Sequence, residues 1–206
     1  MSARKSGQPW AANESQPLFY RLLGPMAEAF SGKQPTSFLR IPLPPKSGRL
    51  YVSPMPFGPY DRGNRLLKAY QRKGVSHALV LVTDEELKKK ARRDLLKAYE
   101  KAGISVIRCP FKDYTAPVHA DITAIMPNVI DALLGHKMVI HCNAGVGRTG
   151  VLAACVVAQV CGCSGEEAID FIANKMLLDL TKEQKRFVVD WVESQADPEP
   201  MLAREA

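Results

Sequence analysis

Short apolar segments alternate with amphipathic helical patterns through most of this chain, and this alternation limits the fold more than any other feature. Apolar, β-branched runs predict strands at residues 49–53, 75–83, 104–109 and 137–142. Helical spacing is found over 64–74, 85–103, 117–135, 148–162, 164–176 and 181–195, with a kink or split expected at Pro127. Strands that alternate with helices predict an α/β fold, with a mostly parallel central sheet flanked by helices on both faces.

The carboxyl ends of parallel strands meet at one edge of a sheet, and functional sites of such folds form in the loops that leave this edge. The loops after Val82, Cys109 and Cys142 should therefore lie side by side. Candidate functional residues are sought in these loops first.

The 206 residues suit one domain of ordinary size. We expect an N-terminal extension over 1–35, partly ordered or packed on the body, with a short helix over 16–30. A single domain is expected over 36–197 and a tail over 198–206. No apolar run reaches the length of a transmembrane helix, and the first residues lack the apolar core of a secretory signal. We interpret the five cysteines as reduced thiols and expect a cytoplasmic protein.

The net charge of +7 is unevenly distributed, because residues 1–80 carry 12 Lys and Arg against three Asp and Glu. A basic N-terminal part could attract an anionic partner, either an acidic protein, a phosphoinositide-bearing membrane or a nucleic acid. An ordinary solvated basic surface is the simpler interpretation. No nucleic-acid partner is expected, since basic and aromatic residues are not interleaved.

The loop after the last predicted strand reads HCNAGVGRTG, and its glycines follow the G-x-G-x-x-G pattern of dinucleotide-binding folds. That fold requires a second strand ending in Asp or Glu about 20 residues later. The corresponding segment, SGEEAIDF, has instead the pattern of a helix start. A nucleotide-binding P-loop is also excluded here, because no Gly-Lys-Ser/Thr occurs.

The same loop suits a cysteine nucleophile better. A tight, glycine-rich turn between a strand and a helix N-terminus directs several backbone N–H groups inward and forms an anion cradle. Arg148 supplies a planar fork that holds two phosphate oxygens at once. Cys142 lies at the base of the cradle, where the field that binds phosphate also stabilises a thiolate.

The motif resembles the signature H-C-x₂-G-x₂-R-[S/T] of the cysteine-dependent protein tyrosine phosphatase superfamily, matched by His141, Cys142, Gly145, Arg148 and Thr149. The resemblance implies a two-step phosphomonoester hydrolysis through a phosphocysteine at Cys142, with no metal or cofactor. It also implies that Thr149 donates its hydroxyl to the sulfur and that His141 orders the loop. The implied phosphate-binding residues are Asn143, Ala144, Gly145, Val146, Gly147 and Arg148.

The family also implies a general acid on a neighbouring loop. Residues 110–117 resemble the P-x-x-D-x-x-x-P loop of dual-specificity phosphatases and point to Asp113, with Lys112 beside it. Asp113 as a simple turn residue is the alternative, and Asp121 is a weaker candidate acid inside a helical pattern. In parts of the family a glutamine holds the attacking water, which points to Gln184. Thr181-x-x-Gln184 is equally a helix capping box, and both interpretations stay open.

The W-P-D and K-N-R-Y segments of tyrosine-specific members are absent. The chain is therefore most similar to the dual-specificity group, notably its cyclin-dependent-kinase-associated and Cdc-fourteen-like members. This implies hydrolysis of phosphotyrosine in proteins, with phosphoserine and phosphothreonine as further substrates. One alternative is a phosphoinositide or inositol phosphate phosphatase, although Asn143 and Val146 lack the charge that such enzymes use there. The other is a phosphate-recognising binding module, although Cys142, Arg148 and Asp113 are all present.

Overall fold

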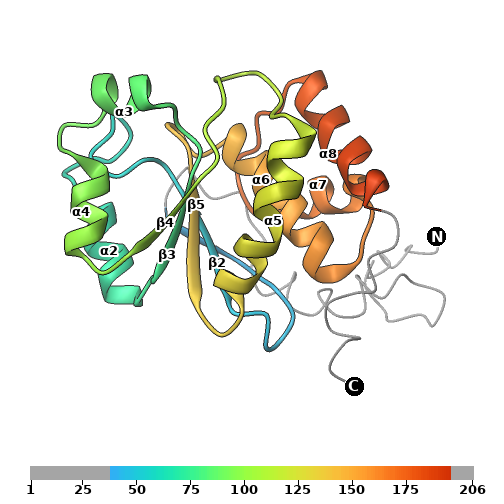
Figure 1. The fold of residues 1–206 in the computed structure, drawn as a ribbon, viewed down its shortest axis with the longest axis horizontal. Helices are drawn as coiled ribbons and strands as arrows, with labels where there is room; N and C mark the ends of the chain where they lie inside the picture. The colour runs from blue at the N-terminus through green and yellow to red at the C-terminus, as the bar shows by residue number, and fades with distance from the viewer. Residues whose placement is uncertain (1–37, 196–206) are drawn as a thin grey trace, which may run out of the picture.

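A five-stranded sheet lies at the centre of the protein (Figure 1), in a computed structural model that describes residues 38–195. The extension expected over 1–35, with its short helix, and the tail expected over 198–206 lie outside the described residues. The strands are β1 Leu39–Ile41, β2 Arg49–Ser53, β3 His77–Val80, β4 Ser105–Arg108 and β5 Lys137–His141. Their order across the sheet is β1-β2-β5-β3-β4.

The sheet is mostly parallel, as the alternation of strands and helices predicts. The strands β2, β5, β3 and β4 run parallel, and only β1 is antiparallel to its neighbour β2. The strand β1 was not predicted, because it has only three residues beside a proline-rich segment and these are too few for an alternating pattern. The inner strands β3 and β5 are almost entirely buried, as continuous apolar runs require.

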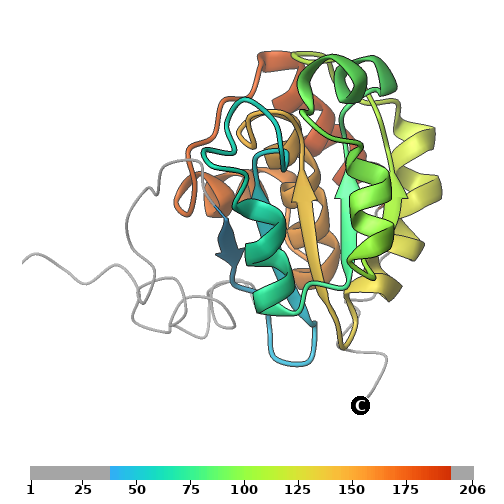
Figure 2. The same cartoon turned by 90° about the vertical axis from the view of Figure 1, so that its left-hand side faces the viewer.

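Helices cover both faces of the sheet (Figures 1 and 2). The first group is α2 Leu66–Lys73, α3 Asp84–Lys90 and α4 Leu95–Lys101. The second group, on the other side, is α5 His119–Leu133, α6 Arg148–Cys161, α7 Gly165–Ala173 and α8 Lys182–Ser194. This confirms the predicted helix–sheet–helix architecture.

The most buried helix is α6, which packs against β5, β2 and the three other helices of its group. Almost all of its residues are inaccessible to solvent, because it is apolar on every side. It ends at Gly162, which adopts the left-handed conformation with φ 62°. Its N-terminus lies directly after β5, so the fold presents the start of a buried helix at the carboxyl edge of the sheet.

Two helical predictions need correction. The helix expected over 85–103 is two helices, because Ala91 is extended and the Asp94 side chain starts α4 by accepting a hydrogen bond from the amide of Lys97 at 3.1 Å. The backbone N–H of Arg92 between them donates to Phe57 O. The helix expected to split at Pro127 instead runs unbroken from His119 to Leu133 as α5.

No helix within residues 38–195 combines the length and apolar character needed to cross a membrane. All five cysteines are found in this part of the chain as buried free thiols. Burial raises the pKa of Cys109 to about 11 and that of Cys161 to about 12, so both stay protonated at neutral pH.

Candidate active site

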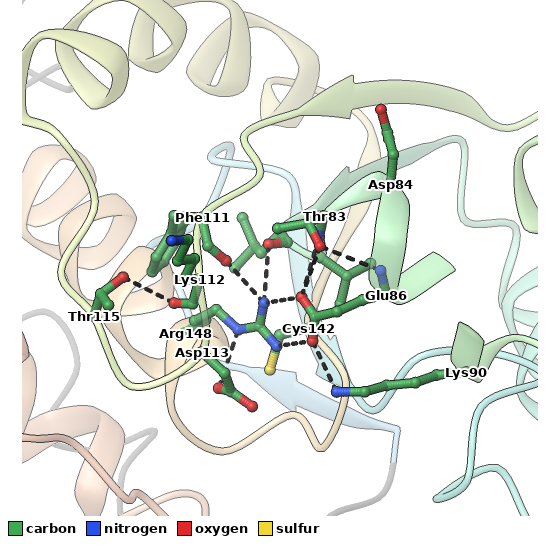
Figure 3. Close-up of polar contacts among 12 residues, drawn as sticks. Thr83, Asp84, Glu86, Lys90, Phe111, Lys112, Asp113, Thr115, Cys142 and Arg148 are labelled. Carbon is green, nitrogen blue, oxygen red and sulfur yellow. Dashed lines mark hydrogen bonds and ion pairs between the residues drawn. The ribbon is translucent and has the colours of Figure 1, made fainter. Parts of the chain in front are cut away.

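The loops that follow β3, β4 and β5 meet around one side chain, that of Arg148 (Figure 3). Its Nη1 donates a hydrogen bond of 2.9 Å to the carbonyl of Phe111, after β4, and lies 3.5 Å from the carbonyl of Leu81, after β3. Arg148 itself opens α6, after β5. The predicted meeting of three loops at one edge of the sheet is therefore confirmed.

The loop between β5 and α6 has the shape of an anion cradle. The N–H of Gly145 points at the sulfur of Cys142, with 3.2 Å between nitrogen and Sγ. Gly145 has φ +81°, and a Cβ there would lie 2.6 Å from the backbone carbonyl of Ser53, so only glycine fits. The loop is tied to the segment after β2, because the amide of Met55 donates to Asn143 O at 3.1 Å.

Cys142 lies at the floor of this cradle with 3% of its surface exposed. An N–H donor aimed at the sulfur stabilises the thiolate form, which is the reactive form of cysteine. The loop residues that follow, from Asn143 to Gly147, are partly or fully buried and connect the sulfur to the start of α6. The arrangement suits attack by sulfur on an anion held in the loop.

The guanidinium of Arg148 is completely buried and is held by Glu86 of α3. The two groups form a bidentate pair, with Nη1–Oε2 at 2.6 Å and Nη2–Oε1 at 2.8 Å. Burial raises the pKa of Glu86, but the hydrogen bonds from Arg148, Lys90 and Thr83 outweigh it and bring the pKa down to about 2. For Arg148, burial lowers the pKa, yet Glu86 and the nearby sulfur raise it above the ordinary value.

Glu86 was missed in the sequence because it lies in the charged run DEELKKK, which has the pattern of a solvated helix face. Glu85 and Lys89 do behave in that way and form an exposed pair, whereas Lys90 is partly buried and pairs with Glu86. One available signal was the spacing Thr83-x-x-Glu86, a capping box that the structure confirms at the start of α3. Because Thr83 lies in the loop that follows β3, this box places Glu86 close to the carboxyl edge of the sheet.

Asp113 lies on the other side of the guanidinium, with its Oδ1 3.2 Å from Nε of Arg148 (Figure 3). Its side chain is 41% exposed, so the carboxylate faces both the arginine and solvent. The Nε–H is buried and makes no hydrogen bond of acceptable geometry within residues 38–195. Asp113 is therefore the charged group that faces this edge of the guanidinium. The weaker candidate Asp121 is instead in the first turn of α5.

His141 is fully buried and belongs to a polar network beneath the loop. Its Nε2 is 2.8 Å from the hydroxyl of Tyr99, and its Nδ1 is 3.4 Å from Cys142 O. Burial lowers the pKa of His141 to about 4, with the charges of Arg108 and Arg148 acting in the same direction. A neutral imidazole therefore separates the loop from the helix α4 at neutral pH. The sequence analysis missed Tyr99, because a tyrosine at helical spacing is typical of a hydrophobic core.

The hydrogen bond expected from Thr149 to Cys142 is not formed, and this prediction was wrong. Thr149 Oγ1 is buried without a hydrogen-bond partner in the described part of the chain. The sulfur takes its hydrogen bond from the amide of Gly145 instead. Thr149 lies in the first turn of α6, directly after Arg148.

Gln184 fulfils the capping-box prediction at the start of α8. Its backbone N–H donates a hydrogen bond of 3.1 Å to the hydroxyl oxygen of Thr181, and its side-chain Oε1 accepts one of 3.1 Å from the backbone N–H of Thr181. Its Nε2 also donates to the carbonyl of Thr115 in the loop that carries Asp113, at 2.9 Å. Each polar atom of the side chain thus has one protein partner, and a second N–H on Nε2 and a second lone pair on Oε1 are left.

Lys112 is exposed beside Asp113, and its carbonyl accepts a hydrogen bond from Thr115 that closes the loop. Within residues 38–195, no group of three or more His, Cys, Asp or Glu side chains is placed to hold a metal ion. The polar groups that converge at the edge of the sheet are therefore a sulfur, a guanidinium and two carboxylates (Figure 3).

Comparison with known proteins gives consistent results. The family model described as "Polymorphic toxin system, DSP-PTPase phosphatase" matches residues 62–161. Protein tyrosine phosphatase domain-containing protein 1 of Mus musculus is 38% identical over 84 residues, which cover 39% of this chain and 11% of that protein. Cyclin-dependent kinase inhibitor 3 of Homo sapiens is 33% identical over 103 residues, which cover 49% of each chain. The chain thus spans about half, or less, of the length of these relatives.

Among solved structures, the fold is similar to that of kinase-associated phosphatase with its catalytic-site cysteine replaced by serine. The TM-score is 0.69 at 22% sequence identity, and the similarity covers 81% of this chain and 99% of that one. At this level of identity the similarity concerns the fold.

Proposed function

Because the chain belongs to the cysteine-dependent protein tyrosine phosphatase superfamily, in its dual-specificity group, we propose that it hydrolyses phosphomonoesters of proteins through a phosphocysteine intermediate. The proposed substrate is phosphotyrosine, with phosphoserine and phosphothreonine as further substrates. The observation that carries the proposal is the Cys142 sulfur in a loop with Arg148, whose buried Nε lies 3.2 Å from Asp113 Oδ1. Similarity to this family supports a phosphatase, and the substrate and the phosphocysteine mechanism below are our proposal.

In the first step the phosphate enters the cradle and displaces Asp113 from Nε of Arg148. Its oxygens bind that Nε–H and the N–H groups of the loop from Asn143 to Gly147. The Cys142 thiolate attacks phosphorus while the bond to the ester oxygen breaks. Asp113, protonated, gives its proton to the departing oxygen, so the alcohol or phenol leaves neutral and the phosphoryl group stays on sulfur.

In the second step a water molecule attacks the phosphorus of the phosphocysteine. Asp113, now a carboxylate, takes a proton from that water, and inorganic phosphate leaves as the thiolate is restored. The buried hydroxyl of Thr149, which has no partner within residues 38–195, is available to the departing sulfur. We propose that Gln184 supports this step by holding the Asp113 loop through the carbonyl of Thr115.

A phosphoprotein fits the site better than a multiply phosphorylated inositol. The loop positions Asn143 and Val146 carry no charge, so they offer nothing to additional phosphates. Lys112 is the one cation beside the acid within its loop, and it is exposed. A phosphate-release panel of phosphotyrosine and phosphothreonine peptides, phosphoinositides and inositol phosphates tests this preference. Release from inositol phosphates that exceeds release from all peptides would reverse it.

Hydrolysis of para-nitrophenyl phosphate in the presence of a chelator tests the reaction itself. We expect turnover by the wild type and none above background by Cys142→Ser. Cys163→Ser makes the same chemical change at a thiol at the far end of α6 and serves as the matched control, which should keep its activity. Wild-type turnover equal to that of Cys142→Ser would refute the enzyme and leave a binding module. Rapid acid quench during turnover, followed by detection of a phosphoryl group on the peptide of this protein that contains Cys142, would identify the intermediate.

A further inference from the structure

A groove of about 390 Å³ lies between α2 and α4. These two helices lie on the face of the sheet opposite α6 (Figures 1 and 2). Leu67 of α2, Ala98 of α4 and the ring of Phe57 form its apolar lining. We propose that this groove binds an acidic segment of the phosphoprotein substrate and so selects among substrates. The proposal rests on the phosphoprotein phosphatase function proposed above.

The walls of the groove carry two rows of cations. Lys97 and Lys101 are four residues apart on α4 and therefore share one helix face, and Arg93 lies on the groove just before the N-cap Asp94. On α2 and its N-cap the corresponding row is Arg65, Lys68 and Arg72, which lines an adjoining hollow of about 540 Å³. Both hollows share Gln71, so they form one continuous surface.

These cations are largely uncompensated. Asp94 is the only acidic residue lining the groove, and its pair with Lys97 is loose, at 3.7 Å between two exposed side chains. Within residues 38–195, the other five basic residues of the two rows form no ion pair, namely Arg65, Lys68, Arg72, Arg93 and Lys101. A concentrated field of this sign attracts a partner with clustered carboxylates.

The shape favours a peptide over a bilayer or a nucleic acid. The apolar atoms are recessed at the bottom of a groove, whereas a membrane surface requires protruding apolar side chains. The only aromatic residue that lines the groove, Phe57, is 5% exposed and is covered by Arg93 at 5.3 Å from the ring centre, so it offers no platform for a base. A peptide can place carboxylates on the rows and an apolar side chain on the floor.

The groove begins at the same edge of the sheet as the active site. Phe57 follows β2, whose parallel pairing with β5 brings its carboxyl end beside Cys142. Two residues earlier, Met55 donates its amide hydrogen to Asn143 O. A peptide whose phosphate lies in the loop can therefore extend its flanking residues toward Arg93 and Lys97.

The test compares the double variant Lys97→Gln/Lys101→Gln with the control Lys185→Gln/Arg186→Gln on α8. Each removes two exposed cations, one of them from a weak helical ion pair. Substrates are two phosphotyrosine peptides of one length, with flanks of Asp and Glu on either side or of Asn and Gln. For the wild type and the control we expect kcat/KM to favour the acidic peptide by about threefold to tenfold, from exposed ion pairs. In the groove variant this preference should disappear, while para-nitrophenyl phosphate turnover is unchanged.

Several outcomes would overturn the proposal. They are a preference that persists in the groove variant, one lost equally in the α8 control, or one insensitive to 0.5 M salt. Sedimentation with phosphatidylserine vesicles measures membrane binding separately. A groove variant that loses vesicle binding but keeps the preference for the acidic peptide would assign the surface to membranes. Fluorescence anisotropy with the acidic peptide lacking phosphate measures binding without turnover. If the wild type has no phosphatase activity but still binds this peptide through Lys97 and Lys101, the proposed reaction is refuted and the proposed binding groove is not.

Discussion

Replacement of Glu86 by glutamine is the sharpest test of how this site is held together. Glutamine keeps the length and shape of the side chain but removes its charge. In the wild type, Glu86 holds both Nη atoms of a fully buried Arg148, at 2.6 and 2.8 Å. The variant leaves the guanidinium buried with one neutral acceptor in place of a carboxylate, and breaking a buried pair from one side is costly.

The magnitude follows from the pKa of Glu86, which is lowered from 4.5 to about 2. That difference corresponds to about 3 kcal/mol of folding free energy. The Glu86 side chain is 14% exposed, and solvent screening reduces the value to about 2 kcal/mol. The stabilisation is complete above pH 4.5 and is lost as the pH falls toward 2, because the carboxylate becomes protonated. For a domain of this size we expect a decrease in Tm of about 4–8 °C at neutral pH.

Urea unfolding of the wild type and Glu86→Gln from pH 7 to pH 3 measures this directly. The difference in unfolding free energy should be largest at pH 7 and shrink below pH 4.5. Glu85→Gln is the matched control, because Glu85 is 73% exposed and pairs with Lys89 on the same helix, so its effect should stay below about 0.5 kcal/mol. We also expect kcat/KM to fall about tenfold or more as the guanidinium loses its orientation. A difference that is equal at pH 7 and pH 3, or matches that of Glu85→Gln, would refute the reasoning.

Three further substitutions test other parts of the site. Tyr99→Phe leaves the buried Nε2 of His141 without its partner at 2.8 Å, so urea unfolding should show a loss of about 1–3 kcal/mol; a loss near zero would mean that the network has no weight. Gly145→Ala places a Cβ 2.6 Å from the carbonyl of Ser53 at φ +81°, so turnover should nearly vanish with an unchanged circular dichroism spectrum, and normal turnover would contradict the loop geometry. Asp113→Asn should slow phenyl phosphate hydrolysis by about 100-fold and affect para-nitrophenyl phosphate much less, because nitrophenolate leaves without a proton; equal losses would exclude Asp113 as the acid.

The architecture could be predicted from the sequence because its signals are local and periodic. The buried strands β3 and β5 are continuous apolar runs, and α6 follows a glycine-rich turn. The elements that were missed have weak local signals. The strand β1 has three residues, and the break between α3 and α4 depends on the capping Asp94 and on a backbone hydrogen bond from Arg92 to a distant loop.

The same distinction applies to the site. The motif placed Cys142 and Arg148 together because they share one loop, and Asp113 follows a neighbouring strand. Glu86 and Tyr99 reach the site from helices whose patterns are those of ordinary surface and core positions. Only the packing of these helices on the sheet shows which members of each pattern face the loop, and spacing along the chain does not contain that information.

The contacts of Arg148 explain why this position needs a guanidinium. Nη1 and Nη2 are occupied by Glu86 and by the carbonyl of Phe111, so this half of the side chain joins α3 and the loop after β4 to the start of α6. Nε lies on another edge, 3.2 Å from Asp113, and is the edge that binds the phosphate in the mechanism we propose. A planar group with five N–H donors divides these tasks between its edges, whereas an ammonium is a single point charge that would have to choose between them. Glu86, which fixes the arginine, and Asp113, which phosphate displaces in the proposed mechanism, therefore lie on different edges of one guanidinium. Binding a substrate in this way need not disturb the contacts that hold the loops in place.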